Sequence, residues 1–247
     1  MQTVMIIPAK GFSRRIPRKN MKSFCGVPLV GWSVIQGMAA KSVRDVYVTT
    51  DDHAIGAYAE GLGARVIYRR YQDTNATSGS VPVKEAITRL LNEGTIELTT
   101  PLITRLCTTP TLLPHDLDGM VDLYWHNIEK YGVNGLSCGA PCRTHIVSRQ
   151  VVPGVSVSIP EATCHNDNSI VHHLSFASVQ LASTMLGHKD PDVDPNAKPF
   201  RGCYFYSFQE WQMQDCDTEE EWEFAEVVAE HYILKGRTVE EVYYGDN

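Results

Sequence analysis

The chain has 247 residues, enough for one sizeable α/β domain, and its 43% hydrophobic and 21% charged residues are typical of a folded protein. Its net charge of −7 argues against general nucleic-acid binding, which normally uses a basic face. Seven cysteines, an odd number, predict reduced thiols in a cytosol-like compartment. The sequence shows no signal-peptide pattern and no apolar run of membrane-spanning length, so we expect a cytoplasmic protein without a membrane partner.

The first predicted element is a buried strand over residues 4–7, which leads into a basic loop. Six cations fall within thirteen residues of this loop, from Lys10 to Lys22, and no acidic residue precedes Asp45. A strand that feeds a cationic turn suits a polyanion such as a triphosphate. The alternative is a solvated basic loop. Gly11, Ser13 and Asn20 favour a binding loop, because they suit a turning backbone with donors that point inward.

Charge is also divided between the two ends of the chain. The first 44 residues carry eight cations and no acid, whereas residues 210–246 hold 12 of the 29 carboxylates. A cationic head and an acidic tail could meet at one site, with phosphates on one side and a divalent metal on the other.

Hydrophobic periodicity predicts alternating helices and strands after the basic loop. In chain order these are a helix over 28–40, a strand over 45–50, a helix buried through Ile55, Tyr58, Ala59 and Leu62, a strand over 65–68, a helix over 81–91, a strand over 102–107 and a helix over 116–129. Leu29, Trp32, Ile35 and Met38 are expected to form the apolar stripe of the first helix. Asp51 or Asp52 is expected to cap the second helix, and capping is the preferred explanation for both aspartates.

The pattern changes between residues 139 and 197. Prolines, glycines and an alternating stretch near Val155 predict an inserted antiparallel excursion, serving as a lid or a subunit contact. A strand over 203–207 then returns to the sheet. A helix over 218–234 follows, opened by a capping box at Thr218 and Glu221, and a final strand is predicted over 239–244.

This order predicts a doubly wound, mostly parallel α/β sheet in a single domain over residues 1–247. Ligands of such sheets bind beyond the carboxyl ends of the strands, where the basic loop, Arg70 and Thr108 are expected. No Gly-x-Gly-x-x-Gly follows the first strand and no P-loop motif is present, which disfavours a dinucleotide oxidoreductase and a P-loop NTPase.

Residues 6–20 read IIPAKGFSRRIPRKN, and this run closely resembles the nucleotide-binding signature of the acylneuraminate (CMP-sialic acid) cytidylyltransferases. Three further segments resemble the family in the right order: VTTDD at 48–52, TTP at 108–110 with DLD at 116–118, and DCDTEE at 215–220. The resemblance implies a Rossmann-like nucleotidyltransferase fold and a homodimer whose inserted segment packs on the partner subunit. It also implies a Mg²⁺-dependent reaction in which CTP and an acidic 2-keto sugar give a CMP-sugar and pyrophosphate.

The resemblance also assigns roles to particular residues. Asp215 and Asp217 become the metal ligands, and with Lys19 they are the catalytic group. Capping of the last helix is the alternative role for Asp217. The implied nucleotide contacts are Lys10, Gly11, Ser13, Arg14, Lys19, Asn20, Arg70 and Ser80, and the candidate substrate contacts are Leu106, Thr108, Thr109, Lys198 and Arg201.

The chain departs from the family pattern at three places. Lys10 replaces an arginine, and Leu106 and Leu112 stand where the family has glutamine and arginine. Lys198 and Arg201 are the nearest candidates for the arginine that contacts the sugar carboxylate. Two alternatives therefore stay open: a sibling nucleotidyltransferase with another nucleotide or acceptor, and a non-catalytic sugar-nucleotide binder.

Overall fold

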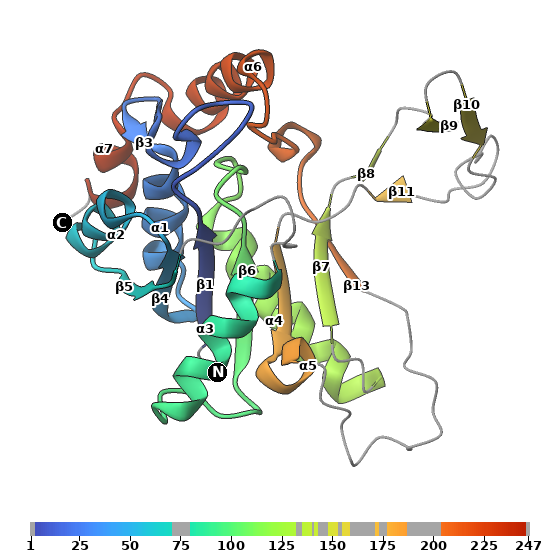
Figure 1. The fold of residues 1–247 in the computed structure, drawn as a ribbon. Helices are drawn as coiled ribbons and strands as arrows, with labels where there is room; N and C mark the ends of the chain where they lie inside the picture. Colours follow the sequence, from blue (N-terminus) through green and yellow to red (C-terminus); the bar gives the residue numbers. More distant parts are fainter. Residues whose placement is uncertain are drawn as a thin grey trace.

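The computed structural model describes residues 3–70, 80–131, 135–139, 141–142, 148–152, 155–158, 171–172, 177–186 and 204–245. Its centre is a seven-stranded sheet in the order β13-β7-β12-β6-β1-β4-β5 (Figure 1). The strands are β1 (Thr3–Ala9), β4 (Val43–Thr50), β5 (Arg65–Tyr68), β6 (Pro101–Arg105), β7 (Gly135–Gly139), β12 (Ala177–Leu181) and β13 (Tyr204–Ser207). All neighbouring pairs are parallel except those of β12, which runs antiparallel to β6 and β7. The predicted mostly parallel sheet is confirmed.

Helices cover both faces of this sheet. The helices on the sheet are α1 (Leu29–Ala39), α2 (His53–Gly61), α3 (Ser80–Asn92), α4 (Pro114–Tyr131) and α5 (Ala182–Leu186). Helices α6 (Glu219–Ala229) and α7 (Val239–Tyr244) pack on the outer side of α1 instead. One buried cluster joins α1, α2 and α4 to the sheet, and another joins α3 and α5 to its opposite face. Apolar side chains three and four positions apart share one side of a helix, so the sequence predicts an inward side for α3 and for α4. All eight of these side chains are buried: Val83, Ala86, Ile87 and Leu90 of α3, and Leu117, Met120, Val121 and Tyr124 of α4.

Helix α1 has no solvent-facing side along most of its length. Leu29, Trp32 and Ile35 are buried as predicted, but Met38 is exposed. Val30 and Val34 pack on the sheet, whereas the predicted stripe packs against a third cluster formed with α6 and α7. The helix is therefore sandwiched between two cores, and a one-sided stripe underestimates its burial.

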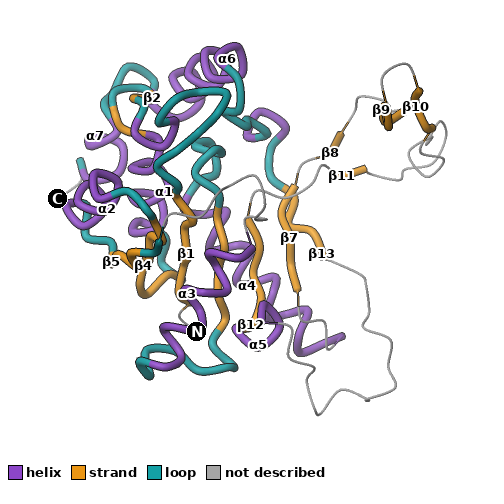
Figure 2. The backbone as a smooth tube through the Cα atoms, viewed as in Figure 1, coloured by secondary structure: helices purple, strands orange, loops and turns teal. Residues whose placement is uncertain are grey.

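The predicted excursion over 139–197 rejoins the sheet earlier than expected. Strand β12 pairs with β6 over five residues and separates β6 from β7, which the sequence analysis did not predict. Antiparallel pairing does occur within the segment, between β9 (Ser148–Val152) and β10 (Val155–Ser158) and between β8 (Pro141–Cys142) and β11 (Val171–His172). These short pairs are separate from the seven-stranded sheet (Figure 2).

The predicted final strand over 239–244 is wrong, because Val239–Tyr244 is helix α7. Thr238 accepts a hydrogen bond from the Glu241 amide, and the Glu241 side chain accepts one from the Thr238 amide. This capping box satisfies two amides at the start of the helix. The Thr-x-x-Glu spacing of this capping box is present in the sequence and is typical of a helix start.

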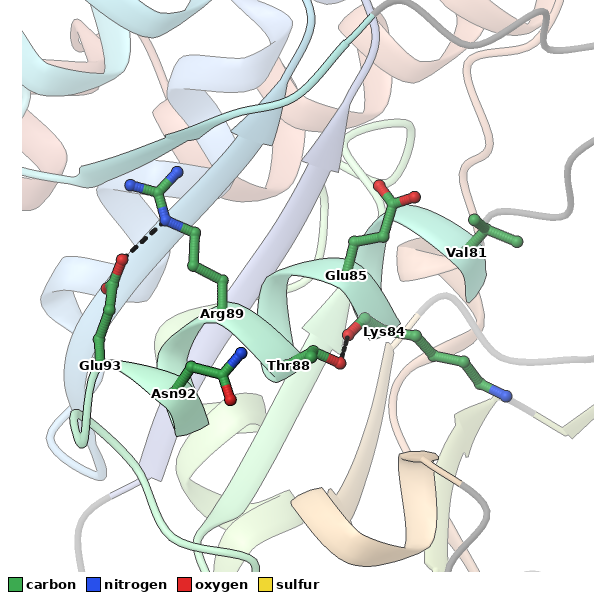
Figure 3. A pocket seen from close by; sticks show the side chains of 7 residues that line it. All are labelled: Val81, Lys84, Glu85, Thr88, Arg89, Asn92 and Glu93. Atoms are coloured by element: carbon green, nitrogen blue, oxygen red, sulfur yellow. Dashed lines mark hydrogen bonds and ion pairs between the residues drawn. The ribbon is translucent and has the colours of Figure 1, made fainter.

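The cap of α7 leads to a stability prediction. We expect Thr238→Ala to lower the free energy of unfolding by about 1 kcal/mol, because the alanine cannot accept the Glu241 amide. Urea unfolding monitored by circular dichroism measures this change. Thr88→Ala is the matched control, since Thr88 lies on the exposed side of α3 and bonds only its own helix, at the Lys84 carbonyl (Figure 3). Alanine is the better helix former, so equal losses in both variants would contradict the capping role.

Candidate active site

The basic loop leaves the carboxyl end of β1 and reaches helix α6, which follows the acidic segment 215–217. In Figure 1 the blue chain after β1 rises beside α6. Lys22 pairs with Glu219, and its Nζ lies 4.5 Å from the centroid of the Trp222 ring. The turn of the β2–β3 hairpin (Ser23–Phe24 and Val27–Pro28) is also attached to α6, because the Cys25 amide donates to Glu226 at 2.8 Å. These contacts bring residues 10–22 against residues 215–217.

A cavity of about 340 Å³ lies where the two segments meet. Its polar lining is Lys10, Ser13, Arg14, Arg15, Lys19 and Asp217. The Ser13 hydroxyl is buried and has no hydrogen-bond partner among the described residues. A buried donor without a partner is costly, so this hydroxyl is suited to a ligand oxygen. Four predicted nucleotide contacts and one predicted metal ligand therefore line a single cavity.

Asp217 joins the cations of this cavity. Its two carboxylate oxygens accept hydrogen bonds from Lys19 Nζ and from an Arg15 guanidinium nitrogen, each at 2.5 Å. Burial alone would raise the pKa of Asp217, but the hydrogen bonds and charges of Lys19 and Arg15 outweigh burial and lower it below the usual value of 3.8. The cluster therefore stabilises the fold above that value, and the contribution is lost as the pH falls through the lower folded-state pKa.

Asp217 is not the helix cap that the alternative interpretation proposed. Thr218 caps α6, and its capping box with Glu221 is formed as predicted. Arg15 was not among the predicted site residues, although it belongs to the run of loop cations. The sequence shows that Arg15 is a cation, but only the folded structure shows that its side chain points to Asp217.

Asp215 and Asp217 are the two ends of a tight turn, in which the Asp217 amide donates to the Asp215 carbonyl at 2.9 Å. The loop after β6 supports this turn, because the Cys216 amide donates to the Thr108 carbonyl at 2.8 Å. Burial raises the pKa of Asp215, although a hydrogen bond with the Thr108 side chain partly offsets this. One Asp215 carboxylate oxygen, Oδ1, is buried without a partner among the described residues. Two carboxylates thus lie in one short segment: Asp217 lines the cavity and is paired with cations, and Asp215 next to it has an oxygen without a partner among the described residues.

Three further contacts hold the basic loop in place, two of them to the segment after β4 and one within the loop itself. The Gly11 amide donates to Asp51 at 2.9 Å, the Asn20 side chain donates to the Lys10 carbonyl at 2.8 Å, and Arg18 lies 3.3 Å from Asp52. Asp52 caps α2 as predicted. Asp51 does not cap it, which corrects the expectation that both aspartates would.

Gly11 is required by a close approach of backbone to side chain. A Cβ atom at this position would lie 2.7 Å from the Asp52 side chain. We expect Gly11→Ala to displace the loop and to weaken triphosphate binding at the cavity by about 100-fold, the cost of a small misplacement of binding groups. Calorimetric titration with CTP, the nucleotide that the sequence resemblance implies, measures this effect. The control is Gly61→Ala, because the space around Gly61 is open within 4 Å, and equal losses in both variants would contradict the packing argument.

The loop after β6 contains residues of two kinds. Leu106 is exposed, and Thr108 contacts the Asp215 segment, so both can face a ligand. Thr109 is buried and its hydroxyl bonds the Leu106 carbonyl at 3.3 Å, a contact that stabilises the loop itself. Arg105, which the sequence analysis missed, is fully buried and donates to Gln36 and to the carbonyl oxygens of Thr109 and Leu112.

Arg70 is not brought to this cavity, and three other predicted residues fall wholly or partly outside the described part of the chain. Arg70 lines a separate hollow of about 300 Å³ with Arg69 at the end of β5. Ser80 is the first residue of α3, and its side chain lies outside the described residues. Lys198 and Arg201 also lie outside the described residues, so their predicted contacts stay predictions.

A larger hollow of about 540 Å³ lies along the outer side of α3, as Figure 3 shows. It contains none of the predicted site residues, and its Arg89 is paired with Glu93 at 2.8 Å. The smaller cavity at the basic loop is the better candidate, because it combines several cations, an acid and an unpartnered hydroxyl. Within the described part of the chain, no helix combines the length and the apolar character that a membrane span needs.

Solved structures define the class of the fold. The structure of CMP:2-keto-3-deoxy-manno-octonic acid synthetase complexed with CTP superimposes with a TM-score of 0.58 at 16% identity, over 75% of this chain and 76% of that one. A cytidylyltransferase from Leptospira borgpetersenii gives a TM-score of 0.59 at 17% identity, over 96% and 90% of the two chains. The fold is thus shared with nucleotide-using cytidylyltransferases.

The sequence places the chain within one family. Residues 4–152 match the cytidylyltransferase family model, and the chain belongs to that family. It is 31% identical over 121 residues to N-acylneuraminate cytidylyltransferase B of Danio rerio, covering 49% of this chain and 27% of that protein. It is 35% identical over 99 residues to pseudaminic acid cytidylyltransferase of Campylobacter jejuni, covering 39% and 42%. The matched region thus spans less than half of the length of each relative.

Proposed function

We propose that the protein is a nucleotidyltransferase that activates an acidic 2-keto sugar with CTP, giving a CMP-sugar and pyrophosphate. The hydroxyl on the anomeric carbon of the sugar attacks the α-phosphorus of CTP and releases its proton to solvent, and pyrophosphate leaves with the electrons of the bond between the α-phosphorus and the bridging oxygen. Phosphoryl transfer asks for positioning and neutralisation of charge more than for covalent chemistry by the protein. The names of the family and of the relatives support this reaction class.

The observation that carries the proposal is the cavity shared by the basic loop and Asp217. Lys10, Arg14 and Lys19 supply positive charge on one side, and the unpartnered Ser13 hydroxyl supplies a donor. Cations are best placed to neutralise phosphate oxygens where water is partly excluded. Asp217 is the counterion of Lys19 and Arg15 and holds both cations at the cavity.

The residues present fit a magnesium ion. Asp215 and Asp217 are separated by one residue, and the unpartnered Asp215 oxygen offers a ligand. Mg²⁺ is commonly held by one or two carboxylates, with waters and phosphate oxygens completing its shell. When bound, the metal supplies charge neutralisation and lowers the pKa of the attacking hydroxyl.

The test is an assay for pyrophosphate release with CTP, Mg²⁺ and a panel of nonulosonic and octulosonic acids. We expect turnover with at least one acid and none when the metal is chelated. Absence of turnover with every acid, together with absence of CTP binding, would refute the proposal. CTP binding without turnover would instead favour the non-catalytic sugar-nucleotide binder.

A sibling activity with another nucleotide or acceptor is favoured by one observation. Leu106 presents an exposed apolar side chain just after β6, where the family that the sequence resembles has a glutamine. Ranking CTP, dCTP, UTP, ATP and GTP by thermal shift distinguishes a CTP-dependent enzyme from one that uses another nucleotide, because a ligand that binds the folded state raises Tm. Assembly as a homodimer through the segment 139–197 stays a prediction from the sequence.

A further inference from the structure

A buried ion pair lies behind the basic loop and outside its cavity. The Arg69 guanidinium is 3.7 Å from Asp51 Oδ1, and the two side chains are 7% and 2% exposed. Arg69 follows β5 and Asp51 follows β4, so both lie at the carboxyl edge of the sheet next to the end of β1. Neither residue lines the cavity of Lys19 and Asp217.

The same Asp51 oxygen accepts the Gly11 amide at 2.9 Å. Gly11 is the second residue after β1, so this hydrogen bond sets the direction in which the chain leaves the sheet. Lys10, on one side of Gly11, and Ser13, two residues beyond it, both line the cavity. A change in the position of the Gly11 amide is therefore passed directly to two groups that are proposed to hold the nucleotide.

A lone carboxylate would be a poor anchor here. A buried charge without a partner is strongly unfavourable, and a second negative charge near the site would oppose a triphosphate. Arg69 removes both difficulties, because its charge compensates Asp51 without competing for the Gly11 amide. The arrangement extends across three adjacent parallel strands, from Arg69 through Asp51 to Gly11.

We infer that Asp51 and Arg69 are a positioning pair that fixes the Gly11 amide and thereby the start of the nucleotide-binding loop. This inference rests on the proposed function for its ligand, CTP. The pair acts through the loop and touches no reacting atom. Loss of the anchor weakens nucleotide binding more than it slows the chemical step.

The experiment compares three variants by CTP kinetics and by amide hydrogen exchange of the Gly11 region. Asp51→Ala removes both the charge and the acceptor, and we expect it to raise the KM for CTP about tenfold, the worth of one hydrogen bond, with kcat changed less than about threefold. The double variant Asp51→Asn with Arg69→Met keeps an oxygen for the Gly11 amide and leaves no unpaired charge. We expect it to restore the KM to within about threefold of the unchanged protein.

Asp118→Ala is the matched control, because Asp118 accepts the Ser42 amide at 2.8 Å, where Ser42 leads into the amino end of β4. It removes carboxylate bonds to the Ser42 and Lys41 amides and to the Ser42 hydroxyl without touching the loop, and Gly11 exchange should accelerate only in Asp51→Ala. The inference is overturned if Asp51→Ala and Asp118→Ala raise the KM equally, or if Gly11 exchange is unchanged. If the unchanged protein neither binds nor uses CTP, the proposed function fails, and Gly11 exchange alone then decides whether Asp51 anchors the loop.

Discussion

Asp215→Asn is expected to reduce kcat with CTP by about 1000-fold and to leave the protein folded. The asparagine has the same shape and can still contact Thr108, but it lacks the charge that a divalent metal requires. Lys19, Asp217 and the loop cations remain in place, so CTP in the absence of metal should bind with nearly unchanged affinity. Turnover measured at increasing Mg²⁺ concentrations, beside calorimetric binding of CTP, separates these two effects.

The same substitution is expected to stabilise the protein at neutral pH. Burial raises the pKa of Asp215, so its ionised form is less favourable in the folded state than in the unfolded state. A raised carboxyl pKa gives its most favourable contribution to stability at low pH, and that contribution declines as the pH rises through 3.8 towards the higher folded-state value. Asparagine avoids this loss, and we expect a rise in Tm of about 2 °C.

Glu223→Gln is the matched control for Asp215→Asn. Glu223 is an exposed carboxylate on α6, and its change to an amide alters net charge equally. It should change neither kcat nor Tm by a measurable amount, because exposed single charges contribute little. Retention of more than a tenth of kcat in Asp215→Asn would contradict the metal-binding assignment. A lower Tm for Asp215→Asn than for the unchanged protein would contradict the argument that burial of the ionised Asp215 carboxylate destabilises the folded state.

Local signals predicted most of the fold. The inward residues of α3 repeat every three to four positions, and β1 and β6 are short apolar runs that polar turns terminate, so their form follows from patterns within a few residues. The short connections between these elements then predict parallel crossovers. Asp52 and Thr218 were predicted as caps for the same reason, because capping depends on residues two or three positions away.

Features set by distant contacts were harder to predict. Strand β12 enters the sheet antiparallel between β6 and β7, a choice made by pairing partners far from it in sequence. Asp51 looks like a helix cap in sequence and becomes the anchor of Gly11, 40 residues earlier, only in the folded chain. Arg105 ends an apolar strand, and its burial depends on acceptors that the following loop supplies.

The candidate site also combines features that the sequence predicts with features that depend on contacts between distant residues. Charge patterning predicted that the basic loop and the acidic tail could meet, and the structure places Lys19 and Asp217 together across 198 residues. The resemblance to a known family selected Asp215 and Asp217 among the twelve carboxylates of the last segment. The pairing of Arg15 with Asp217 could not be predicted, because six similar cations compete for the same acids.

Lys19→Met is expected to reduce kcat/KM for CTP by about 1000-fold, with a small change in stability. Lys19 is 9% exposed, and its ammonium group lies in the cavity against Asp217. Partial exclusion of water strengthens its attraction for phosphate oxygens, and methionine keeps the length of the side chain without the charge. Arg15 stays paired with Asp217, so that carboxylate is not left alone. Steady-state kinetics at fixed Mg²⁺ measures the loss.

Comparison of Lys19→Met with Lys22→Met tests whether the use of CTP depends on where the cations of the loop lie or only on how many there are. Lys22 belongs to the same loop but pairs with Glu219 and contacts the Trp222 ring, away from the cavity lining. Both variants remove one positive charge from the loop, so a general attraction for CTP would fall equally in each and would weaken with added salt. A localised contact predicts a large loss for Lys19→Met alone, which moderate salt does not reproduce in the unchanged protein. Equal losses in the two variants would mean that the loop attracts nucleotide by its field and that Lys19 has no special place in catalysis.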